Sequence, residues 1–318
     1  IIAKGRKLKG IKKSIFFWAV NLGLNYDLQG KSWLYKKQLA LANKLVFSKW
    51  REALGGNIRV IVSGGAALQQ RLSRVYSSAG IEILEGYGLT ETSPVIAVNT
   101  FDKAGRKFGS VGKPIANVDV KIADDREILV KGPNVMQGYY KEPEMTKEAI
   151  DTDGWFHTGD LGKLEAEGHL RITGRKKALF KTAMGKYISP EHIENKLVES
   201  PFIDAALVIG ENQKFAAALI VPDFVHLRSW CMIKNIPYSS DAEMVSNPEI
   251  RKRFQKVIND VNKDLGSFEQ VRKFELMKEE WTIQTRELTA NLKLRRNYIC
   301  EKYKEVINRI FNIEEKAA

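Results

Sequence analysis

GWFHTGDLG (residues 154–162) and HLRITGRKKALFKTAMGKYISPEHIE (residues 169–194) are the stretches on which the interpretation of this sequence depends. Asp160 lies between Gly159 and Leu161 with no basic neighbour in sequence. It therefore suits a carboxylate that accepts hydrogen bonds from a neutral diol such as a ribose. Arg175 offers a planar fork of donors that suits hydroxyl and phosphate oxygens. Together the two side chains predict a nucleotide site.

The composition is that of a globular protein. The chain has 318 residues, of which 44% are hydrophobic and 28% are charged, and this length allows two domains. The longest apolar run, residues 15–24, contains Asn21 and is about half as long as a membrane helix needs to be. We recognise no membrane-spanning segment and no secretory signal.

The cysteines point to a reducing compartment. Cys231 and Cys300 lie far apart, each inside a helical pattern. We favour two buried free thiols in the cytoplasm over a disulfide or a metal pair. The four histidines show no metal-ligand spacing, so no zinc site is expected.

Positive charge is concentrated at the beginning of the chain. Residues 1–54 hold twelve lysines or arginines and two acids, a net charge of +10 out of the total of +13. Residues 31–54 also repeat apolar positions at helical spacing. We favour a solvated helix face. The second interpretation is peripheral contact with an anionic membrane surface, and nucleic-acid binding is a distant third because no reader motif accompanies the charge.

A strand, loop, helix and strand follow one another after the basic segment. Residues 58–62 are an apolar run that breaks at a glycine pair, residues 68–79 follow a helical pattern, and residues 81–84 are a second apolar run. The two strands should be parallel neighbours. The loops at residues 63–66 and 85–91 then emerge at the carboxyl ends of the strands, where open parallel sheets bind their ligands.

The next segments predict a smaller sheet and a second domain. Short strands at residues 118–122, 127–131 and 170–173, separated by glycine and proline turns, suggest a small antiparallel barrel or sheet. We interpret GPNVMQGYY (residues 132–140) as a turn with aromatic packing and assign no chemistry to it. After Arg175, a helix capped by Ser189 and Pro190 should lead into two strands, a helical insert and a C-terminal helix.

Three of these segments together resemble the adenylate-forming enzymes, most closely the long-chain fatty acyl-CoA synthetases. They are EGYGLTETSP (residues 85–94), GWFHTGDLG and ITGRKKALFKTAMGKYISPEHIE (residues 172–194). The resemblance covers nearly the whole chain. It implies an α/β fold: part of a large adenylate-forming domain, with a parallel βαβ layer and a small β-barrel over residues 1–174, and then a smaller α+β C-terminal domain over residues 175–318.

The resemblance also assigns roles in nucleotide binding. The matching tyrosine, Tyr87, stacks on the adenine; Thr90 bonds the α-phosphate; Glu91 holds Mg²⁺. Asp160 and Arg175 hold the ribose. The residue types suit these roles, since glycines allow close backbone approach and Mg²⁺ prefers hard oxygen ligands. The remaining positions matched to the nucleotide site are Gly64, Gly65, Ala66, Glu85 and Gly86.

Residues after the domain boundary are matched to the family's conformational change. Lys177 matches the hinge, Gly185 lies in a loop that lets the pantetheine of CoA pass close to the backbone, and Lys293 matches the lysine that stabilises charge during adenylation. The loop before Lys293 departs from the family pattern at Ala290 and Asn291, where a Pro and a second Thr are usual.

The resemblance implies an ATP-dependent fatty acid–CoA ligase with Mg²⁺ and CoA as its other requirements. The family's Ser/Thr/Gly-rich loop ending in Pro-Lys-Gly is not found in the sequence, and the chain does not begin with Met. We therefore expect the C-terminal part of a longer enzyme, with little ligase activity alone. Two alternatives stay open: a ligase for an aryl or amino acid, and a non-catalytic nucleotide-binding or membrane-surface module.

Overall fold

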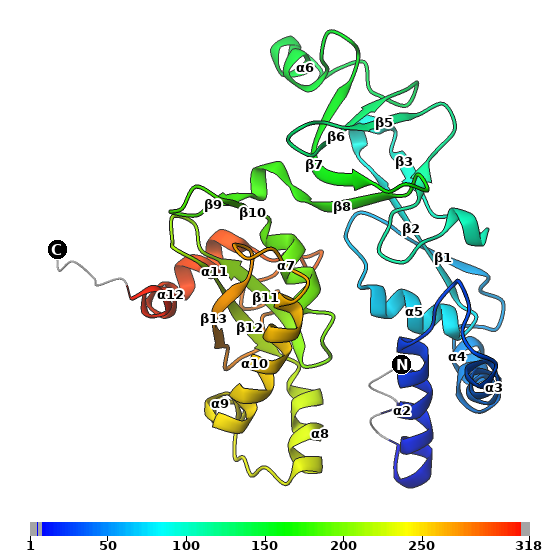
Figure 1. Ribbon diagram of the computed structural model, residues 1–318, viewed down its shortest axis with the longest axis vertical. Helices are drawn as coiled ribbons and strands as arrows, with labels where there is room; N and C mark the ends of the chain where they lie inside the picture. Colours follow the sequence, from blue (N-terminus) through cyan, green and yellow to red (C-terminus); the bar gives the residue numbers. More distant parts are fainter. Residues whose placement is uncertain (1–4, 6–7, 313–318) are drawn as a thin grey trace. The chain divides into compact units, whose positions relative to one another are not determined.

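The computed structural model describes Gly5 and residues 8–312. The chain divides into two compact units, Ile1–Thr173 and Gly174–Ala318. Figure 1 labels the helices and strands of both units. Each unit has its own hydrophobic core, and each is described separately below.

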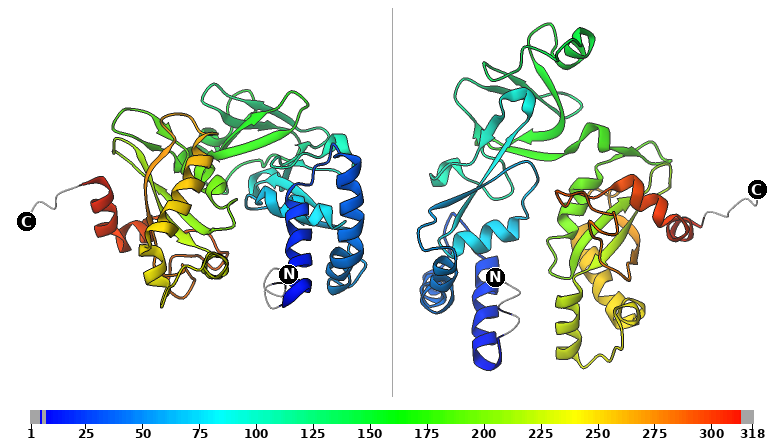
Figure 2. Two further views of the ribbon diagram at one scale, coloured as in Figure 1. Left: turned by 60° about the horizontal axis from the view of Figure 1, so that its bottom comes forward. Right: turned by 180° about the vertical axis from the view of Figure 1, so that it is seen from behind.

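Helices form one layer of the first unit. Phe47, Trp50 and Val75 are among the buried side chains that join them into one core. In both views of Figure 2, α2 lies beside α3 and α5. These helical elements are α2 (Gly10–Leu24), α3 (Trp33–Ala42), the π-helical turn η1 (Asn43–Phe47), α4 (Ser48–Ala53) and α5 (Gln70–Ser78).

A four-stranded sheet carries the strand and helix unit that the sequence predicts. Its order is β1-β2-β3-β4, and the pair β1 and β2 is parallel, as expected, with Ser63 opposite Glu85. The other two pairs are antiparallel. The strands are β1 (Val60–Ser63), β2 (Glu82–Gly88), β3 (Val95–Val98) and β4 (Lys113–Pro114), with the 3-10 turns η2 (Thr90–Thr92) and η3 (Lys103–Gly105).

The second sheet of this unit has the order β5-β6-β7-β8, with antiparallel pairing from β5 to β7. Its apolar side chains pack with Tyr87 and Ile96 of the first sheet in one core. The elements are β5 (Asp119–Ile122), β6 (Glu127–Lys131), α6 (Pro143–Ala149), β7 (Phe156–Leu164) and β8 (Leu170–Arg175).

A three-stranded sheet with helices on both faces forms the second unit. In β11, Ala206 and Val208 face one core with α7, α8 and α10, whereas Leu207 and Ile209 face another with α11 and α12. The order is β11-β12-β13. The elements are η4 (Lys176–Ala178), β9 (Phe180–Lys181), β10 (Tyr187–Ile188), α7 (Pro190–Leu197), β11 (Ile203–Ile209), β12 (Ala216–Pro222), α8 (Phe224–Lys234), α9 (Asp241–Ser246), α10 (Pro248–Asn262), β13 (Val271–Leu276), α11 (Arg296–Lys302) and α12 (Lys304–Phe311).

The structure corrects the sequence analysis in four places. Residues 85–88, expected in a loop, continue β2, because Gly86 and Tyr87 pair with β3. The stretch GWFHTGDLG, to which no strand was assigned, forms most of β7, and β13 was also missed. Cys231 is a buried free thiol as expected, but Cys300 is only partly buried.

Candidate nucleotide site

The glycine loop after β1 lies against the end of β2. A Cβ atom added to Gly64 would stand 3.4 Å from the carbonyl oxygen of Gly86. Gly65 has φ +77°, a backbone conformation that favours glycine. Gly64, Gly65 and Ala66 are all exposed. The glycine loop, whose residues were matched to the nucleotide site, and the EGYG segment are therefore neighbours at the carboxyl edge of the parallel pair.

Glu85 is a buried carboxyl group on β2 opposite Ser63. Its Oε1 lies 3.4 Å from the hydroxyl of Ser73. Burial raises the pKa of Glu85 to about 7, against the lowering effects of Ser73, the Leu68 backbone and the positive charge of Arg171. The protonated and the ionised form of Glu85 are therefore both populated near neutral pH.

Tyr87 and Asp160 are joined directly, although 73 residues separate them in sequence. The Tyr87 hydroxyl donates to Oδ2 of Asp160 at 2.7 Å. Tyr87 is 8% exposed and Asp160 is 4% exposed. The structure thus brings the predicted adenine and ribose residues together, in a pair of which only a small part of the surface is accessible.

Glu127 fixes the backbone around Asp160. Its buried carboxylate accepts a hydrogen bond from the Gly159 backbone N–H at 2.9 Å and lies 3.2 Å from Nδ1 of His157. Thr158 donates to the carbonyl oxygen of Ile128 at 2.8 Å and accepts from the Asp160 N–H at 3.1 Å. The sequence analysis missed Glu127. An acid at the head of the apolar strand sequence EILV was the signal that could have identified it.

Thr90 and Glu91 lie in the 3-10 turn η2 that follows β2. Thr90 is exposed, and Glu91 is half-buried. The Tyr139 hydroxyl donates to Oε1 of Glu91 at 3.0 Å. The part of the chain that the structure describes holds no group of three or more His, Cys, Asp or Glu side chains that could bind a metal by itself. Mg²⁺ commonly takes one or two carboxylates and completes its shell with substrate phosphates. A single half-buried carboxylate such as Glu91 fits that mode of binding.

The other four predicted site residues all belong to the second unit. Arg175 ends β8, and Lys177 is exposed in η4. Gly185 has φ +77° and donates its N–H to the carbonyl oxygen of Thr182 at 2.9 Å, which closes the β9–β10 hairpin. The glycine is therefore required by the turn itself.

Lys293 lies in a tight turn before α11. Its backbone N–H donates to Oγ1 of Thr289 at 3.1 Å, and the Thr289 N–H donates back to the Lys293 carbonyl oxygen at 2.8 Å. Leu288 and Leu294 form an isolated bridge beneath them. The turn is closed without the proline that is usual in the family.

An ion pair between the half-buried Arg296 and the buried Glu194 anchors α11 just after this turn. Arg296 donates to both carboxylate oxygens of Glu194 at 2.7 and 2.8 Å, and to the carbonyl oxygen of Val208 at 2.9 Å. Burial raises the pKa of Glu194, although the nearby Arg296 charge lowers it. These contacts connect the Lys293 turn to α7 and β11.

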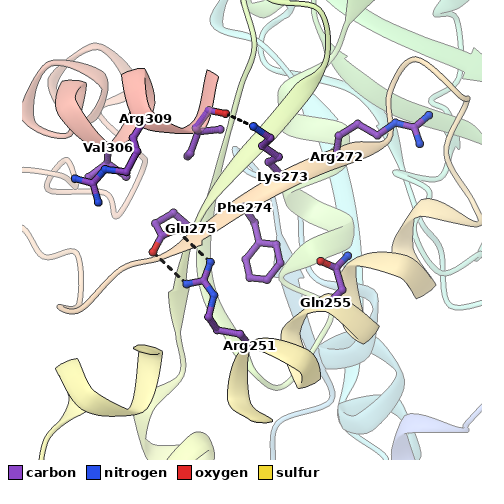
Figure 3. A pocket seen from close by; sticks show the side chains of 9 residues that line it. Arg251, Gln255, Arg272, Lys273, Phe274, Glu275, Val306 and Arg309 are labelled. Carbon is purple, nitrogen blue, oxygen red and sulfur yellow. Dashed lines mark hydrogen bonds and ion pairs between the residues drawn. The ribbon is translucent and has the colours of Figure 1, made fainter. Parts of the chain in front are cut away.

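A cavity of about 340 Å³ lies elsewhere in the second unit, at the outer edge of β13. Figure 3 shows Arg251 paired with Glu275, and Lys273 donating to the carbonyl oxygen of Ile310 at 2.8 Å. None of the predicted site residues lines it. No helix within the described residues has both the length and the apolar character needed to cross a membrane.

Comparison with known proteins assigns the class. Residues 24–140 match the family model described as AMP-binding enzyme, and residues 179–315 match the model described as AMP-binding enzyme C-terminal domain. With a parallel strand pair, a glycine loop and the Tyr87–Asp160 pair in place, the chain belongs to the AMP-binding, adenylate-forming enzymes.

Curated relatives narrow the similarity to one branch. The chain is 39% identical to the long-chain-fatty-acid–CoA ligase FadD15 of Mycobacterium bovis over 91% of the chain and 48% of that protein. It is 36% identical to long-chain-fatty-acid–CoA ligase 6 of Homo sapiens over 85% of the chain and 41% of that protein. The chain thus spans about half the length, or less, of these relatives.

Solved structures support the fold. The adenylation domain of a carboxylate reductase from Mycobacterium chelonae matches with a TM-score of 0.64 at 21% identity, over 94% of this chain and 45% of that chain. The protein MatB from Rhodopseudomonas palustris matches with a TM-score of 0.58 at 26% identity, over 84% and 50%. The predicted α/β fold of the adenylate-forming enzymes is therefore confirmed.

Proposed function

We propose that the chain provides the adenosine-binding part and the C-terminal domain of a long-chain fatty acid–CoA ligase. The reaction has two steps. The fatty acid carboxylate attacks the α-phosphorus of ATP and releases pyrophosphate; the CoA thiol then attacks the acyl carbonyl, gives up its proton and releases AMP. The observation that carries the proposal is the hydrogen bond between Tyr87 and Asp160 beside the glycine loop.

The first unit supplies the groups that bind the nucleotide. Gly64, Gly65 and Ala66 present exposed backbone to the adenine, and the Tyr87 ring offers a face on which the adenine stacks. Asp160 has one oxygen held by Tyr87 and accepts from the ribose. Thr90 donates to the α-phosphate.

Glu91 and the nucleotide phosphates would hold Mg²⁺, which would offset the charge that develops at the α-phosphorus. The Glu91 carboxylate follows directly after the exposed Thr90 hydroxyl, so one turn reaches both the metal and the phosphate.

The second unit supplies Lys293 and the loop for CoA. Lys293 neutralises the carboxylate and phosphate oxygens during adenylation. The C-terminal domain then rotates about Lys177 and presents the hairpin at Gly185, where pantetheine passes close to backbone. The exposure of Lys177 and the turn at Gly185 support these roles.

Contact with an anionic membrane surface is a second candidate function. On α3, Trp33, Leu34 and Leu41 are 68%, 60% and 51% exposed. Lys37 lies in the same helix, and Lys44 lies in the following turn η1. Apolar side chains beside lysines suit the surface of an anionic bilayer. Sedimentation with anionic and with neutral vesicles tests this: Leu34→Ser with Leu41→Ser should lower binding to the anionic vesicles.

Leu292→Ser is the matched control for that measurement, because Leu292 is 68% exposed in the second unit. Equal binding by the α3 variant and the wild type would eliminate the membrane interpretation.

Carboxylate-dependent exchange of labelled pyrophosphate into ATP tests the ligase. The natural protein is isolated from the cells that produce it and is supplied with palmitate, benzoate or an amino acid. We expect exchange with palmitate and a loss of about a hundredfold or more in Lys293→Ala, since removing one charge-stabilising group typically costs that much. Exchange supported only by amino acids would overturn the fatty acid as substrate.

A further inference from the structure

The segment GPNVMQGYY (residues 132–140), to which the sequence analysis assigned only packing, is hydrogen-bonded to the turn that carries Glu91 and to the residues after it. The Met136 N–H donates to the Glu91 carbonyl oxygen at 2.8 Å. The Asn134 side chain donates to the carbonyl oxygens of Thr92 at 3.0 Å and of Val95 at 2.8 Å. Backbone and side-chain donors therefore fix the main chain at Glu91 and on its C-terminal side.

Tyr139 of the same segment also contacts the Glu91 side chain. Its hydroxyl donates to Oε1 of Glu91 at 3.0 Å. Tyr139 is itself held by its backbone N–H, which donates to Oγ1 of Thr146 at 2.9 Å. Gly138 lies so close to this threonine that an added Cβ atom would stand 2.7 Å from Cγ2 of Thr146. Contacts with Thr146 of α6 thus help to fix where the Tyr139 phenol lies.

The hydrogen bond uses only one of the two carboxylate oxygens. Among the described residues, no hydrogen bond or ion pair reaches Oε2 of Glu91. The Tyr139 hydroxyl is the donor of this pair, because an ionised carboxylate can only accept. A carboxylate held through one oxygen offers the other in a fixed direction, which suits a monodentate ligand to a hard cation.

We propose that Tyr139 is a positioning residue that orients Glu91 toward the divalent cation of the bound nucleotide. The inference rests on the proposed function, because it takes Glu91 as the metal ligand. A purely structural role, in which Tyr139 only fastens residues 132–140 to η2, would lower thermal stability without changing the linkage between metal and nucleotide.

The test measures how much Mn²⁺ tightens the binding of ATP to the 318-residue chain. Dissociation constants are determined by calorimetry with EDTA and with excess Mn²⁺, and free Mn²⁺ is counted by electron paramagnetic resonance. Tyr139→Phe removes the hydroxyl and keeps the ring. Tyr140→Phe is the matched control, since Tyr140 is the adjacent residue and is 86% exposed. Glu91→Gln gives the reference for a lost ligand.

We expect Tyr139→Phe to bind ATP in EDTA as tightly as the wild type does. The factor by which Mn²⁺ tightens ATP binding should be about tenfold smaller in this variant, as expected for the loss of a hydrogen bond to a charged group. Tyr140→Phe should keep the full gain. A full gain in Tyr139→Phe, or no gain in the wild type, overturns the inference. Asp160→Asn tests the nucleotide site separately, in EDTA. If this variant binds ATP as tightly as the wild type does, the proposed nucleotide site itself is wrong.

Discussion

Removing the Tyr87 hydroxyl should destabilise the first unit while leaving its aromatic ring in place. The hydroxyl donates to the buried Asp160 carboxylate at 2.7 Å, and the ring packs with Ile96, Val130 and Leu170. Tyr87→Phe keeps the ring contacts and removes a charge-assisted hydrogen bond worth about 1.5–3 kcal/mol. For a unit of this size that loss lowers Tm by roughly 3–10 °C.

Differential scanning calorimetry of Tyr87→Phe beside Tyr140→Phe measures this effect. Tyr140 is 86% exposed, so its variant should unfold at the wild-type temperature. AMP affinity should change less than about threefold in Tyr87→Phe, because the stacking ring remains. Unfolding of Tyr87→Phe at the wild-type temperature would refute the reasoning, since the hydrogen bond would then contribute nothing to the fold.

Three carboxylates give further predictions. Because burial raises the pKa of Glu85 from 4.5 to about 7, the folded state binds an extra proton between these values, and about 3 kcal/mol of stability is lost as pH rises through this window. Glu85→Gln should remove most of that loss in urea unfolding at pH 5 and pH 8, and an unchanged pH dependence would contradict it. Glu127→Ala leaves the Gly159 N–H without its acceptor and should cost about 1–3 kcal/mol and weaken AMP binding, whereas Glu148→Ala, at an exposed position, should do neither. Glu194→Gln removes the charged partner of the half-buried Arg296 and should destabilise the second unit by about 1.5–3 kcal/mol; a loss below about 1 kcal/mol would show that the pair contributes little.

Local patterns in the sequence predicted the parallel strand pair and missed the strands that depend on distant partners. The glycine pair after the apolar run at residues 58–62 marked the end of β1 correctly to within one residue. β2 continues through Gly88 only because β3 supplies partners for Gly86 and Tyr87. In β7, Gly159 adopts φ +69° and interrupts the alternation by which strands are recognised.

The candidate site shows the same division. Tyr87, Glu91 and Asp160 stand in motifs with a family counterpart, so the sequence could name them. Glu127 and Tyr139 act through hydrogen bonds to groups that lie 32 and 48 positions away in the sequence. Such contacts leave no local pattern, and only the folded chain reveals them.

Calorimetric titration of the chain with AMP, for the wild type and for Asp160→Asn, tests the central claim most directly. The amide has the shape of the carboxylate and can still accept from Tyr87, so the fold should survive while one acceptor for the ribose is lost. The account predicts one AMP bound per chain and an affinity about tenfold or more lower in Asp160→Asn. Equal AMP affinity for the two proteins, or no binding by the folded wild type, would contradict it.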